Sequence, residues 1–134
     1  MRAIHMGVEE ARRRRASPTR GDSGSVTAET AVVLPVLVAL TLGLVWLLGL
    51  GVAQLRVVDA ARETARALAR EEPSAGAVDL GRRVAPTGAE FSITEEQGVV
   101  RVQVVAEVTP AAGLLGFLPA VEVDAEAVAA KEAR

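Results

Sequence analysis

The 134-residue sequence contains no cysteine, no tyrosine and one histidine. Without cysteine, a disulfide framework and a thiolate metal site are both excluded. His5 has no second histidine to complete a ligand set or a catalytic pair. The aromatic side chains are Trp46, Phe91 and Phe117, too few to build a surface on which bases or sugars stack.

Catalytic motifs are also missing from the sequence. We find no Ser/His/Asp set, P-loop, HExxH or GxGxxG pattern. A basic run, Arg12 to Arg15, has the charge to bind nucleic acid, but its position just before an apolar segment already explains it. We therefore expect no enzyme activity, no cofactor, no metal and no nucleic-acid partner.

What the sequence does contain is an uncharged apolar run from Thr30 to Leu55, bounded by Glu29 and Arg56. At a rise of ~1.5 Å per residue it forms a helix about 39 Å long, more than the ~30 Å hydrocarbon core of a bilayer. Small residues precede the run rather than follow it, which is the reverse of a secretory signal peptide. The run therefore predicts a single transmembrane helix that the mature protein keeps.

Charge is distributed unevenly on the two sides of this run. Residues 1–24 hold six Arg against three acidic residues, whereas residues 56–134 hold nine Arg or Lys against thirteen acidic residues. Positive charge beside a span marks its cytoplasmic side. We expect a cytoplasmic N-terminus and an extracytoplasmic C-terminal domain.

Two helices are predicted for the region around and after the span. The long helix should run from about Ala28 to Arg70, with Pro35 in its first turns and Glu71, Glu72 and Pro73 ending it. Ser74 is the predicted N-cap of a short helix that reaches Val84. After the span, the long helix should bury one amphipathic face: Val57, Val58, Ala61, Ala65, Leu68 and Ala69.

Beyond Pro86 the apolar period changes from helical spacing to two. Alternation in residues 91–94, 100–108 and 121–128 predicts three strands with one apolar face. The loop residues Leu114, Leu115, Phe117 and Leu118 either close the core or form an exposed patch, and we favour the core. The predicted fold is α+β: a long helix, transmembrane and then amphipathic, followed by a short helix and a small three-stranded antiparallel sheet. The predicted domains are a basic disordered leader (1–24), the transmembrane and extended helix (25–72) and a small extracytoplasmic α+β domain (73–134).

Small residues interrupt the surface of the predicted span. Pro35 should loosen the helix, and lipid-embedded helices tolerate such a proline. Gly43, Gly49 and Gly51 are candidates for close helix packing, although they do not form a GxxxG motif. The glycine content of an ordinary membrane helix is an equally good explanation.

The segment from Gly24 to Glu72 resembles a known family. Gly24, four residues and Glu29 head the apolar run, Leu34 and Pro35 follow early in it, and DAARETARALARE comes after it. This combination resembles TadE-like proteins, the minor pilins or pseudopilins of tight-adherence (Tad, Flp-type) pilus systems. Three positions depart from the expected patterns. Ser25 differs from the residue that many pilins have at the mature N-terminus, and Thr30 differs from the residue that the major Flp pilins have after the glutamate. Thr64 differs from the residue that this family often has there. These departures argue against a major pilin and leave a minor, pilin-like role intact.

The resemblance implies specific roles and partners. A prepilin peptidase would cleave between Gly24 and Ser25, and Glu29 would set the register between assembled subunits. The implied partners are the membrane, other pilin-like subunits and the Tad assembly machinery. The alternative is an uncleaved single-pass protein whose extracytoplasmic tail binds a partner. A soluble enzyme or nucleic-acid binder would require the uncharged run to be a buried core helix, and its length argues against that.

Overall fold

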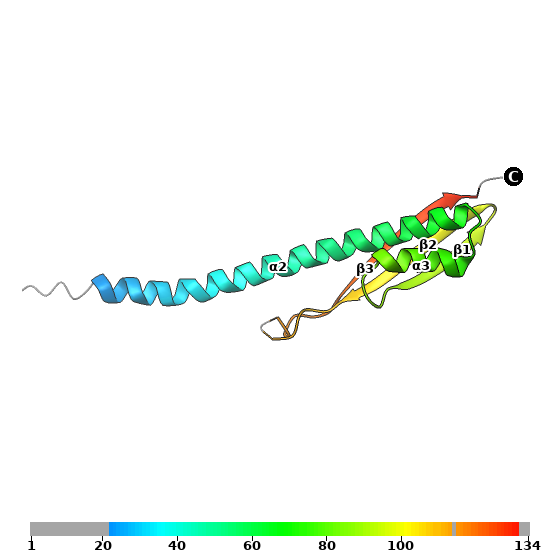
Figure 1. The fold of residues 1–134 in the computed structure, drawn as a ribbon. Helices are drawn as coiled ribbons and strands as arrows, with labels where there is room; N and C mark the ends of the chain where they lie inside the picture. Colours follow the sequence, from blue (N-terminus) through cyan, green and yellow to red (C-terminus); the bar gives the residue numbers. More distant parts are fainter. Residues whose placement is uncertain (1–21, 114, 132–134) are drawn as a thin grey trace, which may run out of the picture. The chain divides into compact units, whose positions relative to one another are not determined.

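The computed structural model describes residues 22–113 and 115–131. Figure 1 shows the elements in chain order: α2 (Asp22–Ala69), α3 (Ser74–Val84), β1 (Glu90–Glu96), β2 (Val99–Val108) and β3 (Val121–Ala130). The chain divides into two compact units, Met1–Leu40 and Thr41–Arg134, and α2 contributes residues to both. The prediction of an α+β fold with a three-stranded antiparallel sheet is confirmed.

The sheet belongs to the second unit and has the strand order β1-β2-β3. A two-residue loop joins β1 to β2, with Glu96 paired to Val99 across it. Gln97 and Gly98 both have positive φ, 49° and 80°, as the twist-compatible turn of a tight hairpin requires. β2 and β3 are also antiparallel, and Val108 pairs with Val121 where the second connection begins and ends.

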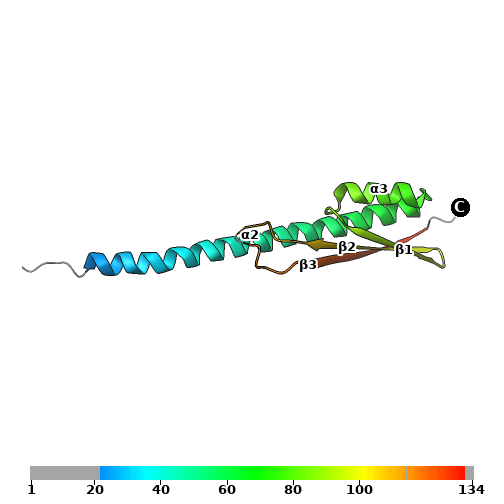
Figure 2. The same ribbon diagram turned by 90° about the horizontal axis from the view of Figure 1, so that it is seen from below.

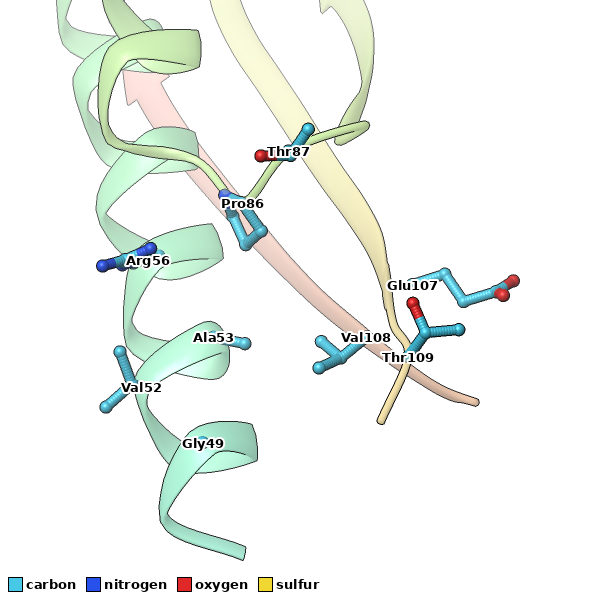
Figure 3. A pocket seen from close by; sticks show the side chains of 9 residues that line it. All are labelled: Gly49, Val52, Ala53, Arg56, Pro86, Thr87, Glu107, Val108 and Thr109. Carbon is cyan, nitrogen blue, oxygen red and sulfur yellow. The ribbon is translucent and has the colours of Figure 1, made fainter. Parts of the chain in front are cut away.

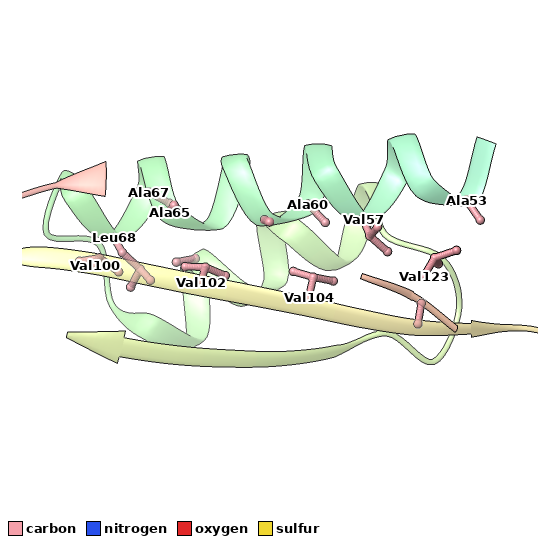
Figure 4. Close-up of a cluster of buried hydrophobic side chains, with 13 residues drawn as sticks. Ala53, Val57, Ala60, Ala65, Ala67, Leu68, Val100, Val102, Val104 and Val123 are labelled. Carbon is pink, nitrogen blue, oxygen red and sulfur yellow. The ribbon is translucent and has the colours of Figure 1, made fainter. Parts of the chain in front are cut away.

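One face of the sheet is covered by helices, and the two views agree that α2 and α3 lie on the same side of it (Figures 1 and 2). β2 is the central strand, and its alternate residues Val100, Val102 and Val104 are fully buried. Figure 4 shows how β2 runs antiparallel to α2, with Val100 beside Leu68 and Val104 beside Val57. The buried residues that complete this core are Ala53, Ala60, Ala61, Ala65, Ala67, Ala77, Ala106 and Val123.

The two helices approach each other closely at Gly81 of α3. A Cβ atom built on Gly81 would lie 2.2 Å from Oγ1 of Thr64 and 2.8 Å from Cε1 of Phe91. Thr64 is fully buried, and its hydroxyl donates a 2.8 Å hydrogen bond to the carbonyl oxygen of Ala60. Only glycine fits at position 81, because no side chain can enter this contact.

α2 ends in hydrogen-bonded turns that reverse the chain toward α3. The N–H of Glu71 donates to the carbonyl oxygen of Leu68, and the N–H of Glu72 donates to that of Ala67. Glu71 occupies the left-handed region, with φ 63°. This pattern satisfies the last carbonyl groups of a helix, and Pro73 prevents its continuation.

Several details of the predicted helices are wrong. α2 begins at Asp22 rather than near Ala28, so Pro35 lies inside the helix and not in its first turns. Pro73, not Ser74, is the N-cap of α3, and no side chain caps the helix there. In the predicted amphipathic face, Val58 and Ala69 are only half-buried. The fully buried residues that the predicted face omitted are Ala60, Thr64 and Ala67.

The loop between β2 and β3 also differs from the prediction. Phe117 is 80% exposed and does not close the core, and Leu115 and Leu118 are half-buried. Leu114 lies outside the described residues. The core is closed instead by small side chains from α2 and by Phe91 and Ile93 of β1, which pack against it.

Candidate functional site

The head of α2 carries the residues that the sequence singled out for processing and assembly. Gly24 and Ser25 lie in its first turn and are exposed. Space is open around Gly24, where an added Cβ would meet no atom within 4 Å. Glycine costs a helix about 1 kcal/mol relative to alanine, so Gly24 weakens the helix beside the bond that follows it.

Glu29 lies one helical turn after Ser25 and is exposed. Thr30, the next residue, donates its hydroxyl to the carbonyl oxygen of Val26 at 2.8 Å, and its side chain is thereby held against the helix. The carboxylate of Glu29 borders a shallow, mostly apolar recess of about 310 Å³. The recess is lined by Val26, Glu29, Thr30, Val33, Leu34 and Leu37.

The candidate packing residues have small side chains or none, so they project little from the helix surface. Pro35 is exposed inside α2, and as a proline it cannot donate to the carbonyl oxygen of Ala31. Gly49 and Gly51 are exposed and Gly43 is half-buried, and a Cβ added at any of the three meets nothing within 4 Å. These positions therefore leave room beside the helix in which a separate helix can pack closely.

Large apolar side chains cover α2 on all sides before its buried face begins. In the described part of the first unit, every side chain from Gly24 to Leu40 is exposed, and Leu44, Leu47 and Leu48 continue this pattern in the second. A helix that is apolar all round is typical of a membrane environment. Gly24–Ala69 is long and apolar enough to cross a membrane.

Comparison with known proteins identifies the same stretch. Residues 24–66 match the model of a family described as TadE-like protein. Over this stretch the chain is similar to TadE-like proteins, and residues 24–66 are called the TadE-like segment below. No curated protein and no solved structure matches the chain.

The TadE-like segment includes more than the apolar run. It continues through Ala53, Val57, Ala60 and Thr64, which are buried against the sheet and α3. The matched segment ends before α3 and the strands begin. The family resemblance therefore covers the candidate span together with the helix face on which the small domain folds.

The polar groups outside the TadE-like segment form a solvated surface. Arg101 pairs with Glu126, and Lys131 pairs with Glu95, all with substantially exposed side chains. Among residues 22–113 and 115–131, no three Asp, Glu or His side chains are grouped closely enough to hold a metal ion. Exposed ion pairs of this kind contribute little to stability.

Proposed function

We propose that this protein is a TadE-like minor pilin, or pseudopilin, with a structural role in the assembly or export of a Flp-type (Tad) pilus. The observation that carries the proposal is the match of residues 24–66 to the TadE-like family, over a helix able to cross a membrane. The protein works through packing of this helix and needs no catalytic group. Its partners are the membrane, other pilin-like subunits and the Tad assembly machinery.

The orientation follows from the charges that flank the helix. The basic leader, residues 1–24, stays in the cytoplasm because positively charged flanks resist transfer across the membrane. The small domain is exported and lies outside. The protein is therefore a single-pass protein of the cell membrane that enters a pilus when it is extracted.

Cleavage between Gly24 and Ser25 removes the leader before assembly. Both residues are exposed at the start of α2, and the helix needs to unwind by only one turn for the bond to enter a peptidase. Gly24 makes that unwinding easier because glycine has a low helix propensity. A prepilin peptidase acting on the cytoplasmic side leaves a mature protein that begins at Ser25.

Glu29 then gains a partner that the precursor lacks. Cleavage creates a positively charged amine on Ser25, four residues before Glu29 and on the same face of the helix. In a bundle of apolar helices an unpaired carboxylate is costly, so Glu29 pairs with the amine of its own or a neighbouring subunit. The pair fixes the axial register of the subunits, and the neighbouring helix fits against the thin surface at Gly43, Gly49 and Gly51.

The decisive experiment is N-terminal sequencing of the membrane-bound protein with and without an active prepilin peptidase. We expect the sequence to begin at Ser25 with the peptidase and the leader to remain intact without it. Gly24→Val, which places a bulky side chain before the bond, should block processing, while Gly43→Ala should not. An intact leader in the presence of an active peptidase would leave the plain single-pass anchor as the better explanation.

Glu29→Gln tests the role of the carboxylate separately from processing. We expect membrane insertion and cleavage to persist and surface pili to be lost, because the amide cannot form the ion pair. Glu96→Gln removes the same charge from an exposed strand end and serves as the matched control. Normal piliation with glutamine at position 29 would reduce Glu29 to an ordinary acidic residue at the start of a helix.

A further inference from the structure

The connection between β2 and β3 presents an unusually exposed apolar side chain. We name residues 115–118 the apolar turn. The N–H of Gly116 donates to the carbonyl oxygen of Gly113, and the N–H of Leu118 donates to that of Leu115, both at 3.0 Å. These two successive turns hold Phe117 outward, where 80% of it is exposed.

Both ends of this connection lie beside one level of α2. Figure 3 shows Ala53 of α2 and Val108 of β2 pointing toward one another across a recess. Thr109 lines the same recess as Gly49, and Val108 pairs with Val121 at the start of β3. Because β2 runs antiparallel to α2, the chain that leaves β2 continues toward the apolar run of the helix.

This level of α2 is where the outer boundary of a membrane falls when the hydrocarbon core starts at Thr30. The uncharged run begins at Thr30, and about 20 residues of helix cross the ~30 Å hydrocarbon core. The outer boundary therefore falls close to Gly49, and Arg56 is the first charged residue beyond it. Gly49 and Arg56 both line the recess from which the connection departs.

We propose that the apolar turn is a second membrane contact, in which Phe117 inserts into the outer interface of the bilayer that the protein's own helix spans. The occupant is lipid because the connection departs beside Gly49, at the level of the headgroups, and carries the exposed Phe117. Phenylalanine and leucine side chains are typical of the apolar side of segments that lie in this interface. Glu107 and Glu122, paired at the strand ends and exposed, limit the insertion to the turn.

The consequence is a small domain held to the membrane at two points. The helix fixes its distance from the bilayer, and the turn fixes its rotation about the helix axis. Extraction from the bilayer would release both contacts together. This inference rests on the membrane-spanning role proposed for α2.

The test uses the full chain in lipid vesicles with and without brominated acyl chains, which quench tryptophan on contact. Trp46 is the one tryptophan in the sequence, so Trp46→Phe gives a background into which Phe117→Trp is introduced. Val128→Trp in the same background is the matched control. Val128 is 54% exposed and pairs with Arg101, far along the strands from the turn.

We expect tryptophan at position 117 to lose intensity with brominated lipid and to emit at shorter wavelength than a fully solvent-exposed tryptophan. Tryptophan at position 128 should do neither. Quenching of native Trp46 tests whether α2 spans the membrane. A failure of the membrane contact at the apolar turn can therefore be distinguished from a failure of the span. Quenched Trp46 with unquenched tryptophan at 117 would overturn the membrane contact and leave the span in place, whereas unquenched Trp46 would overturn both.

Discussion

The apolar side chains in two parts of α2 differ in size and in surroundings. Residues 30–52 are rich in leucine and valine, and most of these side chains are exposed. Residues 53–68 bury mainly alanine against the sheet and α3, together with Val57, Thr64 and Leu68. Side-chain size therefore differs between the two environments: leucine and valine predominate where the helix is mostly uncovered, and alanine predominates where protein backbone comes close.

The largest effect is expected when a charged side chain is placed in the core that packs against the buried part of α2. Val123 is 7% exposed and belongs to the core, whereas the neighbouring Asp124 is exposed. Val123→Asp should cost about 3–5 kcal/mol, because it buries an unpaired carboxylate, and should unfold the small domain. Hydrogen exchange of the β2 amides measures this opening. Asp124→Asn should leave exchange unchanged, and equal tolerance of both substitutions would contradict the observed strand faces.

Two valines on α2, one buried and one exposed, test the difference between the two parts of the helix directly. Val57 is fully buried, and Val45 is 58% exposed. Val57→Ala should lower the free energy of unfolding of the domain by about 1.5–3 kcal/mol through lost burial and an unfilled cavity. Val45→Ala should leave it unchanged. Both are read from urea unfolding in detergent micelles, and a similar loss for the two variants would mean that residue 45 is also packed against the domain.

The close contact between α2 and α3 at Gly81 tests the packing by adding side-chain volume instead of removing it. Gly81→Ala should destabilise the domain by about 1–3 kcal/mol, because its Cβ meets the Thr64 hydroxyl at 2.2 Å. Gly76→Ala in the same helix meets nothing within 4 Å and should add about 0.5–1 kcal/mol of stability. The same unfolding measurement compares them. Two stabilised variants would show that the helices are not in close contact at Gly81.

The smallest effect is expected at Gln54, where the two parts of α2 meet. Its side-chain amide donates a 2.8 Å hydrogen bond to the carbonyl oxygen of Asp124 at the edge of the sheet. Gln54→Met keeps the length of the side chain and removes the donor, so the domain should lose about 0.5–1.5 kcal/mol. Exchange of the β3 amides should report the loss locally. Unchanged protection of β3 would show that this bond does not hold the edge strand to the helix.

The sequence was sufficient for the elements whose patterns are local. The short helix Ser74–Val84 and the three strands follow from apolar period and from turn residues. The predicted start of α2 is wrong because Asp22, Ser23 and Gly24 favour turns and caps and so indicate a break before the apolar run, whereas the helix runs through them. Phe117 was assigned to the core on size alone, although its partners depend on tertiary structure.

The helix crossing was missed for a different reason. A single amphipathic stripe predicts one covered face, but α2 is covered on two sides, by the sheet and by α3. The signal that could have found it is the combination of Gly81 in a short helix with Ala60 and Thr64 in the long one. The candidate site at Gly24, Ser25 and Glu29 came from a linear motif, whereas the level of the β2–β3 connection relative to α2 is visible only in the fold.

The order of the strands also determines when the sheet of the small domain can be completed during folding. The central strand receives its second neighbour from β3, so one edge of β2 stays unpaired until residues 121–130 are available. The hydrogen bond from Gln54 to Asp124 joins residues 70 positions apart. Contacts of such separation form late in folding. If the domain is exported as proposed, the sheet can be completed only after β3 has crossed the membrane, and until then one edge of β2 is open to chaperones and proteases on the outer side.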